Sequence, residues 1–362
     1  TVTTATSSYE YDGKAHFNEG APPSREDGEP PLMPGHKIFV LTHAEITDVG
    51  NTENQLDCKI VSETDVRVNE NYEITYINGK LTVTPRTITV TTATDEWVYD
   101  GKLHFNNTVK DVTRLVLNHT VVVDKYTEIT DADTVDNKFV CRVIAPDDAE
   151  HIVNGNYTIE YVCGKLTVTP REITVTTGDG EWEYDGKIHS NTEYVKVENL
   201  LEDSGHALAV DGENYKTITD VGEVENRVAY IVKNADGDDI SGNYDIKYIC
   251  GSLSVYARTI TVTTRTVTLR YNGYAQSVTD GWKADRLLEE ELGHKLVADE
   301  SKFIASVTEV IEGEIKNEVH YIVHDADGKD ISGNYSITYN YGKISIKPRM
   351  YVVRTASGSR EY

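Results

Sequence analysis

The chain has 362 residues and a formal net charge of −25, with 60 acidic residues against 35 basic ones. This charge is the wrong sign for nucleic-acid phosphates and for anionic membrane surfaces, which Lys and Arg must contact. No run approaches the 18 apolar residues of a membrane-spanning helix. We therefore expect no nucleic-acid partner and no membrane insertion in this segment.

One unit of sequence occurs four times. Tyr-Asp-Gly-Lys begins at Tyr11, Tyr99 and Tyr184, and the variant Tyr-Asn-Gly-Tyr begins at Tyr271. An Asn-Tyr pair recurs at spacings between 85 and 91 residues, at Asn71, Asn156, Asn243 and Asn334. Such self-similarity indicates tandem domains and argues against one large catalytic core. The predicted repeats are 1–86, 87–171, 172–258 and 259–349, and 350–362 is the first strand of a truncated fifth repeat.

The two ends of the chain also match interior positions. Residues 1–6 match residues 89–94, and residues 349–362 match residues 86–99 without a gap. We therefore expect this chain to be an excerpt from a longer array.

Within repeat 2 the elements follow one another as strands. Residues 87–92 alternate strictly, which places Ile88 and Val90 inward and threonines outward. A second strand begins at 97–99 and ends at the Asp100-Gly101 turn. Further strands are predicted at 120–123, 137–144, 157–162 and 166–168, with a long hairpin whose tip is Ile152. The large share of Tyr, Thr and Val is typical of β-sheets.

The variable stretch after the turn is the one helix candidate. In repeat 4, residues 284–293 are good helix formers that end at Gly293, a usual C-terminal stop. Residues 195–205 of repeat 3 are similar. Repeat 1 has Pro22-Pro23 and Pro30-Pro31 there, which exclude a helix. The helix is therefore predicted to be optional.

The junctions between repeats are short. Pro85-Arg86, Pro170-Arg171 and Pro348-Arg349 mark three of them, and Ala257-Arg258 marks the fourth. Proline stiffens such a joint, and no Gly/Ser linker occurs. Strand geometry gives roughly 35–45 Å per domain. The predicted fold class is mostly β: four small, antiparallel, sandwich-like domains in an elongated rod, each with an optional short helix.

The combined motifs resemble a known family. Tyr-Asp-Gly-Lys, Ile-Thr-Asp-Val-Gly (46–50 and 218–222), Gly-Asn-Tyr and Gly-Lys-Leu-Thr-Val-Thr-Pro-Arg are similar to the MBG, or YDG-type, repeats of large bacterial surface proteins. The resemblance covers essentially the whole chain. It implies a mostly β, grasp-like module in extracellular adhesin-like proteins on a bacterial, Gram-positive surface, used as a stalk or spacer. It brings no catalytic residues, and repeat 4 departs from the pattern at Asn272 and Tyr274.

Four cysteines leave one pairing open. Cys141 and Cys163 lie symmetrically about Ile152, so a disulfide could join them across the expected hairpin. The alternative is four free thiols, because Cys58 and Cys250 have no partner in their own repeats. An intramolecular isopeptide bond between a recurring lysine and a recurring asparagine is a further alternative. Its candidate residues are Lys14, Lys102, Lys187, Asn71, Asn156 and Asn243.

Two acidic turns are candidates for calcium. They contain Asp236 and Asp238 in repeat 3, and Asp325 and Asp327 in repeat 4, but neither fits the ligand register of an EF-hand. Their alternative role is a hairpin tip. Recurring histidines allow two per domain in three repeats without a third metal ligand. These are His36, His119, His206 and His294 at one position, and His16, His104 and His189 at the other.

Exposed aromatic side chains can stack on sugar rings, and Trp97, Trp182 and Trp282 are the candidates. Packing between domains is the alternative for these tryptophans. No nucleophilic motif or phosphate-binding glycine loop occurs, so we expect no enzyme and no cofactor. The leading hypothesis is a stalk segment whose partners are its own neighbouring repeats. The alternatives are an array that binds a host glycan or matrix protein, and a filament subunit assembled by strand addition.

Overall fold

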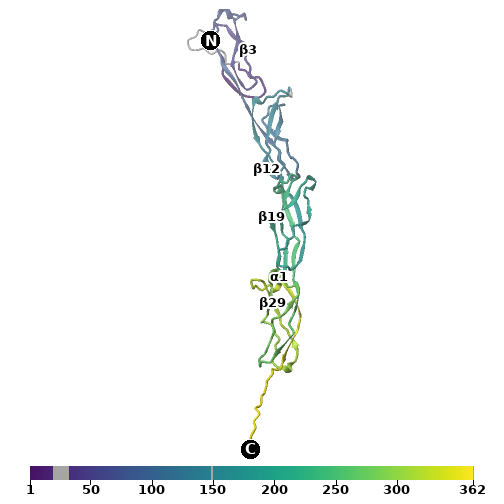
Figure 1. Cartoon of the computed structure of the whole chain (residues 1–362). Coiled ribbons are helices and arrows are strands. Elements are labelled where there is room, and N and C mark those ends of the chain that lie inside the picture. Colours follow the sequence, from purple (N-terminus) through teal and green to yellow (C-terminus); the bar gives the residue numbers. More distant parts are fainter. Residues whose placement is uncertain (19–31, 148–149, 362) are drawn as a thin grey trace. The chain divides into compact units, whose positions relative to one another are not determined.

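The structure, a computed structural model, describes residues 1–18, 32–147 and 150–361 (Figure 1). It is mostly β. The chain divides into two compact units, Thr1–Arg171 and Glu172–Tyr362. Each unit contains two sequence repeats, and the division coincides with the predicted junction between repeats 2 and 3. No helix in the described ranges is long and apolar enough to cross a bilayer.

The strands of unit 1 are short. Repeat 1 contains β1 Val2–Thr3, β2 Ser7–Glu10, β3 Lys37–His43, β4 Gly50–Asn54, β5 Leu56–Val61, the 3₁₀ helix η1 Asn69–Asn71, β6 Tyr76–Ile77 and β7 Gly79–Thr84. Repeat 2 contains β8 Arg86–Thr92, β9 Asp95–Val98, β10 Val109–Thr113, β11 Thr120–Tyr126, β12 Asp133–Asp136, β13 Phe139–Ile144, η2 Asn154–Asn156, β14 Tyr157–Val162 and β15 Lys165–Thr169.

Unit 2 follows the same order. Repeat 3 contains β16 Arg171–Thr177, β17 Gly180–Glu183, β18 Tyr194–Glu198, η3 Glu202–Ser204, β19 Ala207–Tyr215, β20 Gly222–Glu225, β21 Val228–Lys233, η4 Ser241–Asn243, β22 Tyr244–Ile249 and β23 Ser252–Tyr256. Repeat 4 contains β24 Arg258–Thr263, β25 Val267–Arg270, β26 Lys283–Ala284, α1 Glu289–Leu292, β27 Lys295–Ala298, η5 Val310–Glu312, β28 Ile315–Lys316, β29 Tyr321–His324, η6 Ser332–Asn334, β30 Tyr335–Asn340 and β31 Lys343–Lys347.

Two long parallel segments form the frame of repeat 2. β8 pairs with β14 and β9 pairs with β15, both in parallel. β10 and β12 add antiparallel strands to β8 and β15, and β11 pairs antiparallel with β13. The same sheet orders recur in repeats 3 and 4, as β18-β16-β22, β17-β23-β20, β19-β21, β26-β24-β30, β25-β31-β28 and β27-β29. The expectation of purely antiparallel domains was therefore wrong, because the first and last segments of each repeat run in the same direction.

The alternating sequence of the first strand decides which side faces the core. Ile88 and Val90 of β8 have no exposed surface, and neither do Ile173, Val175, Ile260 and Val262 at the equivalent positions of β16 and β24. The inward prediction for Ile88 and Val90 is confirmed. Burial of each such β-branched side chain contributes about 1.5–3 kcal/mol.

A buried threonine closes the turn between the two halves of each repeat. The Thr92 hydroxyl donates to the Asn137 carbonyl at 2.8 Å and accepts the Gly164 N–H at 2.9 Å. Asn137 is fully buried, and its Nδ2 donates to the Ala93 carbonyl at 2.9 Å. A Cβ on Gly164 would lie 2.3 Å from the Ala93 oxygen, so this position requires glycine for close approach. Equivalent bonds link Thr4 to Asn54, Thr177 to Asn226 and Thr264 to Asn317.

The predicted hairpin about Ile152 was wrong. Its two sides begin as neighbours, because Val153 N–H donates to the Val143 carbonyl at 2.9 Å. The chain then turns through η2 and leaves, so β13 pairs with β11 whereas β14 pairs with β8. Long-range parallel pairing therefore replaces the local hairpin.

The helix prediction holds only in repeat 4, and only for one turn. Within 284–293 the helix α1, labelled in Figure 1, covers Glu289–Leu292. It ends at Gly293, which adopts φ of +70°. In repeat 3, most of 195–205 is strand β18 and the short 3₁₀ helix η3, so a regular helix there was wrong. Sheet pairing of β18 with β16 overrides the weak helix preference. The double prolines of repeat 1 lie outside the described residues.

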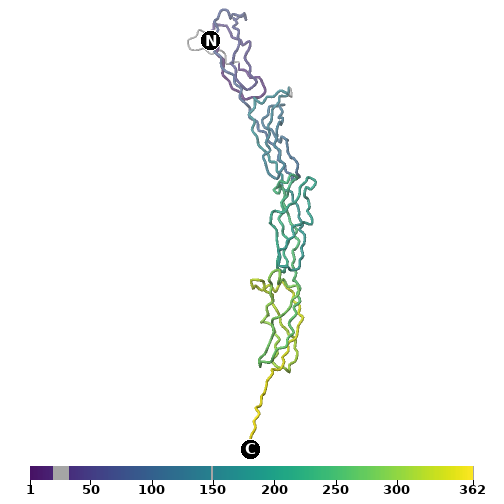
Figure 2. Tube along the Cα trace, viewed as in Figure 1, coloured from purple at the N-terminus to yellow at the C-terminus, as the bar shows by residue number. Residues whose placement is uncertain are grey.

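The junctions inside each unit are as short as predicted. β7 ends at Thr84 and β8 begins at Arg86, and β23 ends at Tyr256 and β24 begins at Arg258. Figure 2 follows the chain through each unit as a Cα trace. One residue between strands gives two consecutive repeats almost no freedom to separate.

Candidate functional site

The Tyr-Asp-Gly-Lys motif forms a capped turn at the end of a strand. Asp12 Oδ1 accepts the Lys14 N–H at 3.0 Å and contacts His16 Nε2 at 2.8 Å, and Gly13 adopts φ of +76°. Only glycine takes such a φ without strain. Burial acts to raise the pKa of the Asp12 carboxyl, but the hydrogen bonds from the Lys14 N–H and from His16, together with the charges of these two residues, bring it below its usual value. Tyr11, which starts the motif, is only 3% exposed.

Tyr11 is buried because repeat 2 covers it. Its ring centroid lies 5.4 Å from that of Tyr157, in an edge-to-face arrangement. Tyr157 in turn bonds His119 Nδ1 through its hydroxyl at 2.7 Å. Edge-to-face aromatic pairs contribute about 0.5–1.5 kcal/mol beyond their buried area. The first residue of the Tyr-Asp-Gly-Lys motif and the Asn-Tyr pair of the next repeat therefore meet in one joint.

The asparagine of the Asn-Tyr pair locks the same joint. Asn156 Nδ2 donates to Asp48 Oδ1 at 2.7 Å, and Asn156 Oδ1 accepts the Val49 N–H at 2.8 Å. Asn156 is 6% exposed. The Ile-Thr-Asp-Val-Gly motif supplies both partners, so two motifs separated by 107 residues form one reciprocal pair of hydrogen bonds.

The arginine of the Pro-Arg junction also connects the two repeats at this joint. Arg86 Nη1 donates to the Tyr11 carbonyl at 3.3 Å, and its Nε donates to the Arg114 carbonyl at 2.6 Å. Arg114 pairs with Glu10 of repeat 1 at 2.5 Å and adopts a left-handed φ of 60°. Non-glycine residues hold such a conformation when their surroundings fix it.

Unit 2 repeats this joint. Asn334 Nδ2 donates to Asp220 Oδ1 at 2.8 Å, and its Oδ1 accepts the Val221 N–H at 2.8 Å. Tyr184 lies 5.5 Å from Tyr335, ring centroid to ring centroid. The arginine contacts recur as well, with Arg258 donating to the Tyr184 carbonyl, and with Arg286 forming an ion pair to Glu183.

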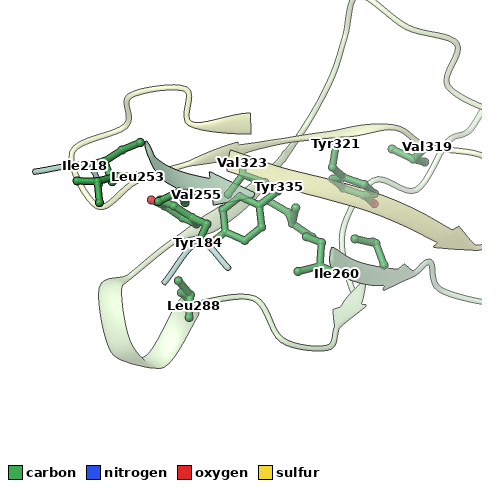
Figure 3. Packing of buried hydrophobic residues seen from close by; sticks show 12 residues of the cluster. Tyr184, Ile218, Leu253, Val255, Ile260, Leu288, Val319, Tyr321, Val323 and Tyr335 are labelled. Atoms are coloured by element: carbon green, nitrogen blue, oxygen red, sulfur yellow. The ribbon is translucent and has the colours of Figure 1, made fainter. Parts of the chain in front are cut away.

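The apolar core is continuous across this joint. One cluster joins Tyr184, Ile218, Leu253 and Val255 of repeat 3 to Ile260, Leu288, Val323 and Tyr335 of repeat 4. Figure 3 shows the rings of Tyr184 and Tyr335 next to each other within this cluster. A matching cluster in unit 1 joins Tyr11 and Val83 to Ile88 and Val90. Each pair of repeats therefore shares buried surface.

Burial controls the titration of the joint residues. It raises the pKa of Tyr157 and of Tyr335 to about 12, so both hydroxyls stay protonated. Burial also lowers the pKa of His119 and His294, which favours the neutral imidazole at pH 7. The joint is thus a neutral aromatic centre, with its charged groups at the edge.

The four calcium candidates do not converge on a ligand set. Asp325 Oδ1 accepts the Asp327 and Lys329 N–H groups, and so serves its own turn. Asp236 and Asp238 are exposed, and their N–H groups donate to Asn234 Oδ1. Within 1–18, 32–147 and 150–361, no group of three or more His, Cys, Asp or Glu side chains is arranged to hold a metal ion.

Cys141 and Cys163 are not joined in this structure. All four cysteines are free thiols. Cys141 is buried in β13 beside Tyr161, and burial raises the pKa of its thiol. Cys163 follows β14, which belongs to a different sheet from β13. The disulfide depended on a hairpin that does not form.

The tryptophans lie against neighbouring side chains. Trp97 stacks on His104 with centroids 4.8 Å apart, and Trp182 stacks on His189 at 4.7 Å. Trp282 packs edge-to-face against Tyr321 at 6.4 Å. One face of each stacked ring is therefore already covered, as a packing role requires.

The positions of Lys187 and Asn156 do not support the isopeptide alternative. The Lys187 side chain is 78% exposed and pairs with Asp185. Asn156 is held by Asp48 and Val49, so its amide is engaged in the joint instead.

The comparisons add no family to this picture. No known family profile and no curated protein matches the chain. A crystal structure of Drosophila N-cadherin EC1-4 aligns over 97% of this chain and 100% of its own, at 7% identity and a TM-score of 0.22. The Bacillus anthracis TIE protein aligns over 88% of this chain and 66% of its own, at 9% identity and a TM-score of 0.19. TM-scores this low do not establish a common fold.

Proposed function

We propose that the chain is a structural stalk segment of a bacterial surface adhesin, which projects a functional domain away from the cell and performs no catalysis. The observation that carries this proposal is the joint, which each of the two units contains with the same residue types. Asn156 and Asn334 make the same reciprocal bonds, and each joint has its own shared apolar core. A joint that is specified in this detail fixes the angle between neighbours, which a spacer requires.

The proposal includes four small β-grasp-like or sandwich-like domains in an extended rod, on a Gram-positive surface. Its acidity suits a long soluble object, because net charge opposes aggregation. Its partners are its own neighbouring repeats.

Small-angle X-ray scattering of the full chain tests the rod. Four domains of roughly 35–45 Å each give a radius of gyration of about 40–50 Å. A single globule of this length would have a radius of gyration of about 21 Å. A value near the lower figure, with a maximum dimension under about 70 Å, would refute the rod.

A second candidate function is glycan or host-protein binding by the array. It is favoured by a surface groove of about 660 Å³ in repeat 3, lined by Tyr215, Tyr248, Glu225 and Arg227. Aromatic side chains beside a few placed polar groups are typical of small-ligand sites. In repeat 4, the equivalent face carries Tyr339 and Tyr341, whose rings are parallel with centroids 5.4 Å apart.

Glycan arrays with the full chain test this candidate. Binding should fall at least several-fold in Tyr248→Ala, and Trp282→Phe serves as the aromatic control away from the groove. Loss of binding in both variants, or in neither, would contradict a site at this groove. Small-angle X-ray scattering tests the stalk proposal independently of this result.

A further inference from the structure

Each joint contains a histidine that bonds the tyrosine of the Asn-Tyr pair. In unit 2, His294 Nδ1 lies 2.7 Å from the Tyr335 hydroxyl, and in unit 1, His119 Nδ1 lies 2.7 Å from the Tyr157 hydroxyl. His294 is 4% exposed. Its ring centroid lies 6.3 Å from that of Tyr184, at an interplanar angle of 22°. The imidazole therefore lies between its own repeat and the preceding one.

The tyrosine hydroxyl determines which atom carries the proton. Burial raises the pKa of Tyr335 to about 12, so the hydroxyl keeps its proton, and it also accepts a hydrogen bond from the Leu288 N–H. Its own proton then points at His294 Nδ1, which must be an unprotonated acceptor. Repeat 1 has the same arrangement, in which the Met33 N–H donates to the Tyr72 hydroxyl at 3.2 Å.

Protonation of His294 is incompatible with this arrangement. The imidazolium carries a proton on Nδ1, so the Tyr335 hydroxyl would face two donors, one from Nδ1 and one from the Leu288 N–H. The positive charge would also lie in a buried aromatic centre, where loss of hydration is costly. Burial accordingly lowers the pKa of His294 in the closed joint. Both effects favour the neutral imidazole for as long as the joint stays closed.

Charged groups around the joint act on the histidine and on the two tyrosines beside it. In unit 2 they are Asp325, Asp220, Asp185, Glu291 and Arg258. In unit 1 they are Asp147, His151, Asp48, Asp12 and Arg86. Asp325 acts to raise the pKa of His294, but the effect of burial is larger. Glu291 and Arg258 act on Tyr335 with opposite signs. Burial therefore decides the charge state of His294.

The turn that carries His294 also docks on the preceding repeat. The His294 N–H donates to the Leu288 carbonyl at 3.2 Å, which closes the turn that contains α1. Leu288 belongs to the apolar cluster shared by the two repeats. Leu292 lies over Gly186 of repeat 3, where an added Cβ would meet its Cδ1 at 2.2 Å. A change at the histidine therefore reaches the contacts that hold the two repeats together.

We propose that each joint is a pH-sensitive coupling, which is closed while its histidine is neutral and opens when the histidine is protonated, with both repeats still folded. In the open joint the imidazole reaches water, so its proton no longer meets the tyrosine hydroxyl in a buried site. A unit is thus stiff at neutral pH and flexible in mildly acidic surroundings. This coupling goes beyond the stalk role and does not depend on it.

Hydrogen exchange at the Val221 amide tests the coupling in unit 2, with protection measured relative to the intrinsic exchange rate at each pH. The open joint binds the proton more readily, with an ordinary histidine pKa of about 6.5, so protection should fall by up to about tenfold between pH 7.5 and 5.5. His294→Gln keeps the side chain neutral, so its protection should stay constant over this range. His320→Gln is the control, because it removes a partly exposed histidine from the same repeat and should keep the fall.

The Thr264 amide separates opening of the joint from unfolding of repeat 4. Its N–H donates to a backbone carbonyl at 3.0 Å within that repeat, so it should stay better protected than Val221 at both pH values. In unit 1 the Val49 amide and His119→Gln give the same test on a second joint, independent of how well one variant folds. The proposal is overturned if Val221 protection does not change between pH 7.5 and 5.5, if it falls equally in His294→Gln, or if Thr264 and Val221 are equally protected at pH 5.5.

Discussion

The two hydrogen bonds of Asn334 allow a direct test of the joint in unit 2. In Asn334→Ala the Val221 N–H loses its acceptor and the Asp220 carboxylate loses a donor. Asp220 is exposed, so water replaces the second bond at little cost. The Val221 amide has no equivalent replacement while repeat 4 stays docked, so the joint should weaken by about 1–2 kcal/mol. The repeats themselves should keep their folds, because Asn334 is not part of the threonine turn.

Hydrogen exchange at the Val221 amide measures this weakening. A cost of about 1–2 kcal/mol should make exchange there roughly 5- to 30-fold faster. Asn71→Ala is the matched control, because Asn71 has the same place in the motif but is exposed. The control should change stability by less than about 0.5 kcal/mol. Unchanged exchange in Asn334→Ala would show that this bond pair does not hold the joint.

Three further predictions concern the joint and the turn. Arg286→Ala should destabilise unit 2 by less than about 1 kcal/mol, because its ion pair with Glu183 is partly exposed. In thermal unfolding, the difference in stability between the variant and the original chain should shrink in 1 M salt, because salt screens the ion pair. Burial lowers the pKa of His294, so the unfolded chain takes up the proton first and unit 2 should lose stability as pH falls through about 6.5. His294→Gln should flatten that slope between pH 7.5 and 5.5, measured by chemical denaturation, and an unchanged slope would contradict this. Gly164→Ala should destabilise unit 1 by about 1–3 kcal/mol or more, because its Cβ meets backbone at 2.3 Å, and Gly155→Ala, which meets nothing within 4 Å, is the control.

The sequence predicts the strands well because their signals are local. Strict alternation at 87–92 places Ile88 and Val90 in the core, and the turn at Asp100-Gly101 ends the next strand where expected. The register of β8 with β14 is not local, since about 70 residues separate the paired positions. Nothing near Ile152 distinguishes a hairpin from a turn that sends the chain to another sheet. The disulfide prediction failed for the same reason.

The joint was not predicted, although the motifs that form its centre were recognised. Tyr11, Asp48, Asn156 and the Pro-Arg junction each belong to a recurring motif, but their recurrence says only that each has some common role. The hydrogen bond from Asn156 to Asp48 spans 108 residues and two repeats. The available signal was the recurrence of both motifs, because the joint inside each unit pairs the Ile-Thr-Asp-Val-Gly of one repeat with the Asn-Tyr of the next.

A shared core has a mechanical consequence for each unit. Tyr184 is 4% exposed, and Tyr335 and Leu288 of the next repeat belong to the cluster that buries it. Unfolding repeat 4 would therefore expose Tyr184 and Ile218 of repeat 3, so the two repeats of a unit stabilise each other. In arrays of this kind, stability is the sum of intrinsic terms and nearest-neighbour interface terms. A repeat of about 87 residues has only a modest core of its own. The joint adds buried apolar surface to that core at the same place where it fixes the angle between the two repeats of a unit. Stiffness and stability of the unit therefore depend on the same buried residues, and a substitution that reduces the shared core should lower both together.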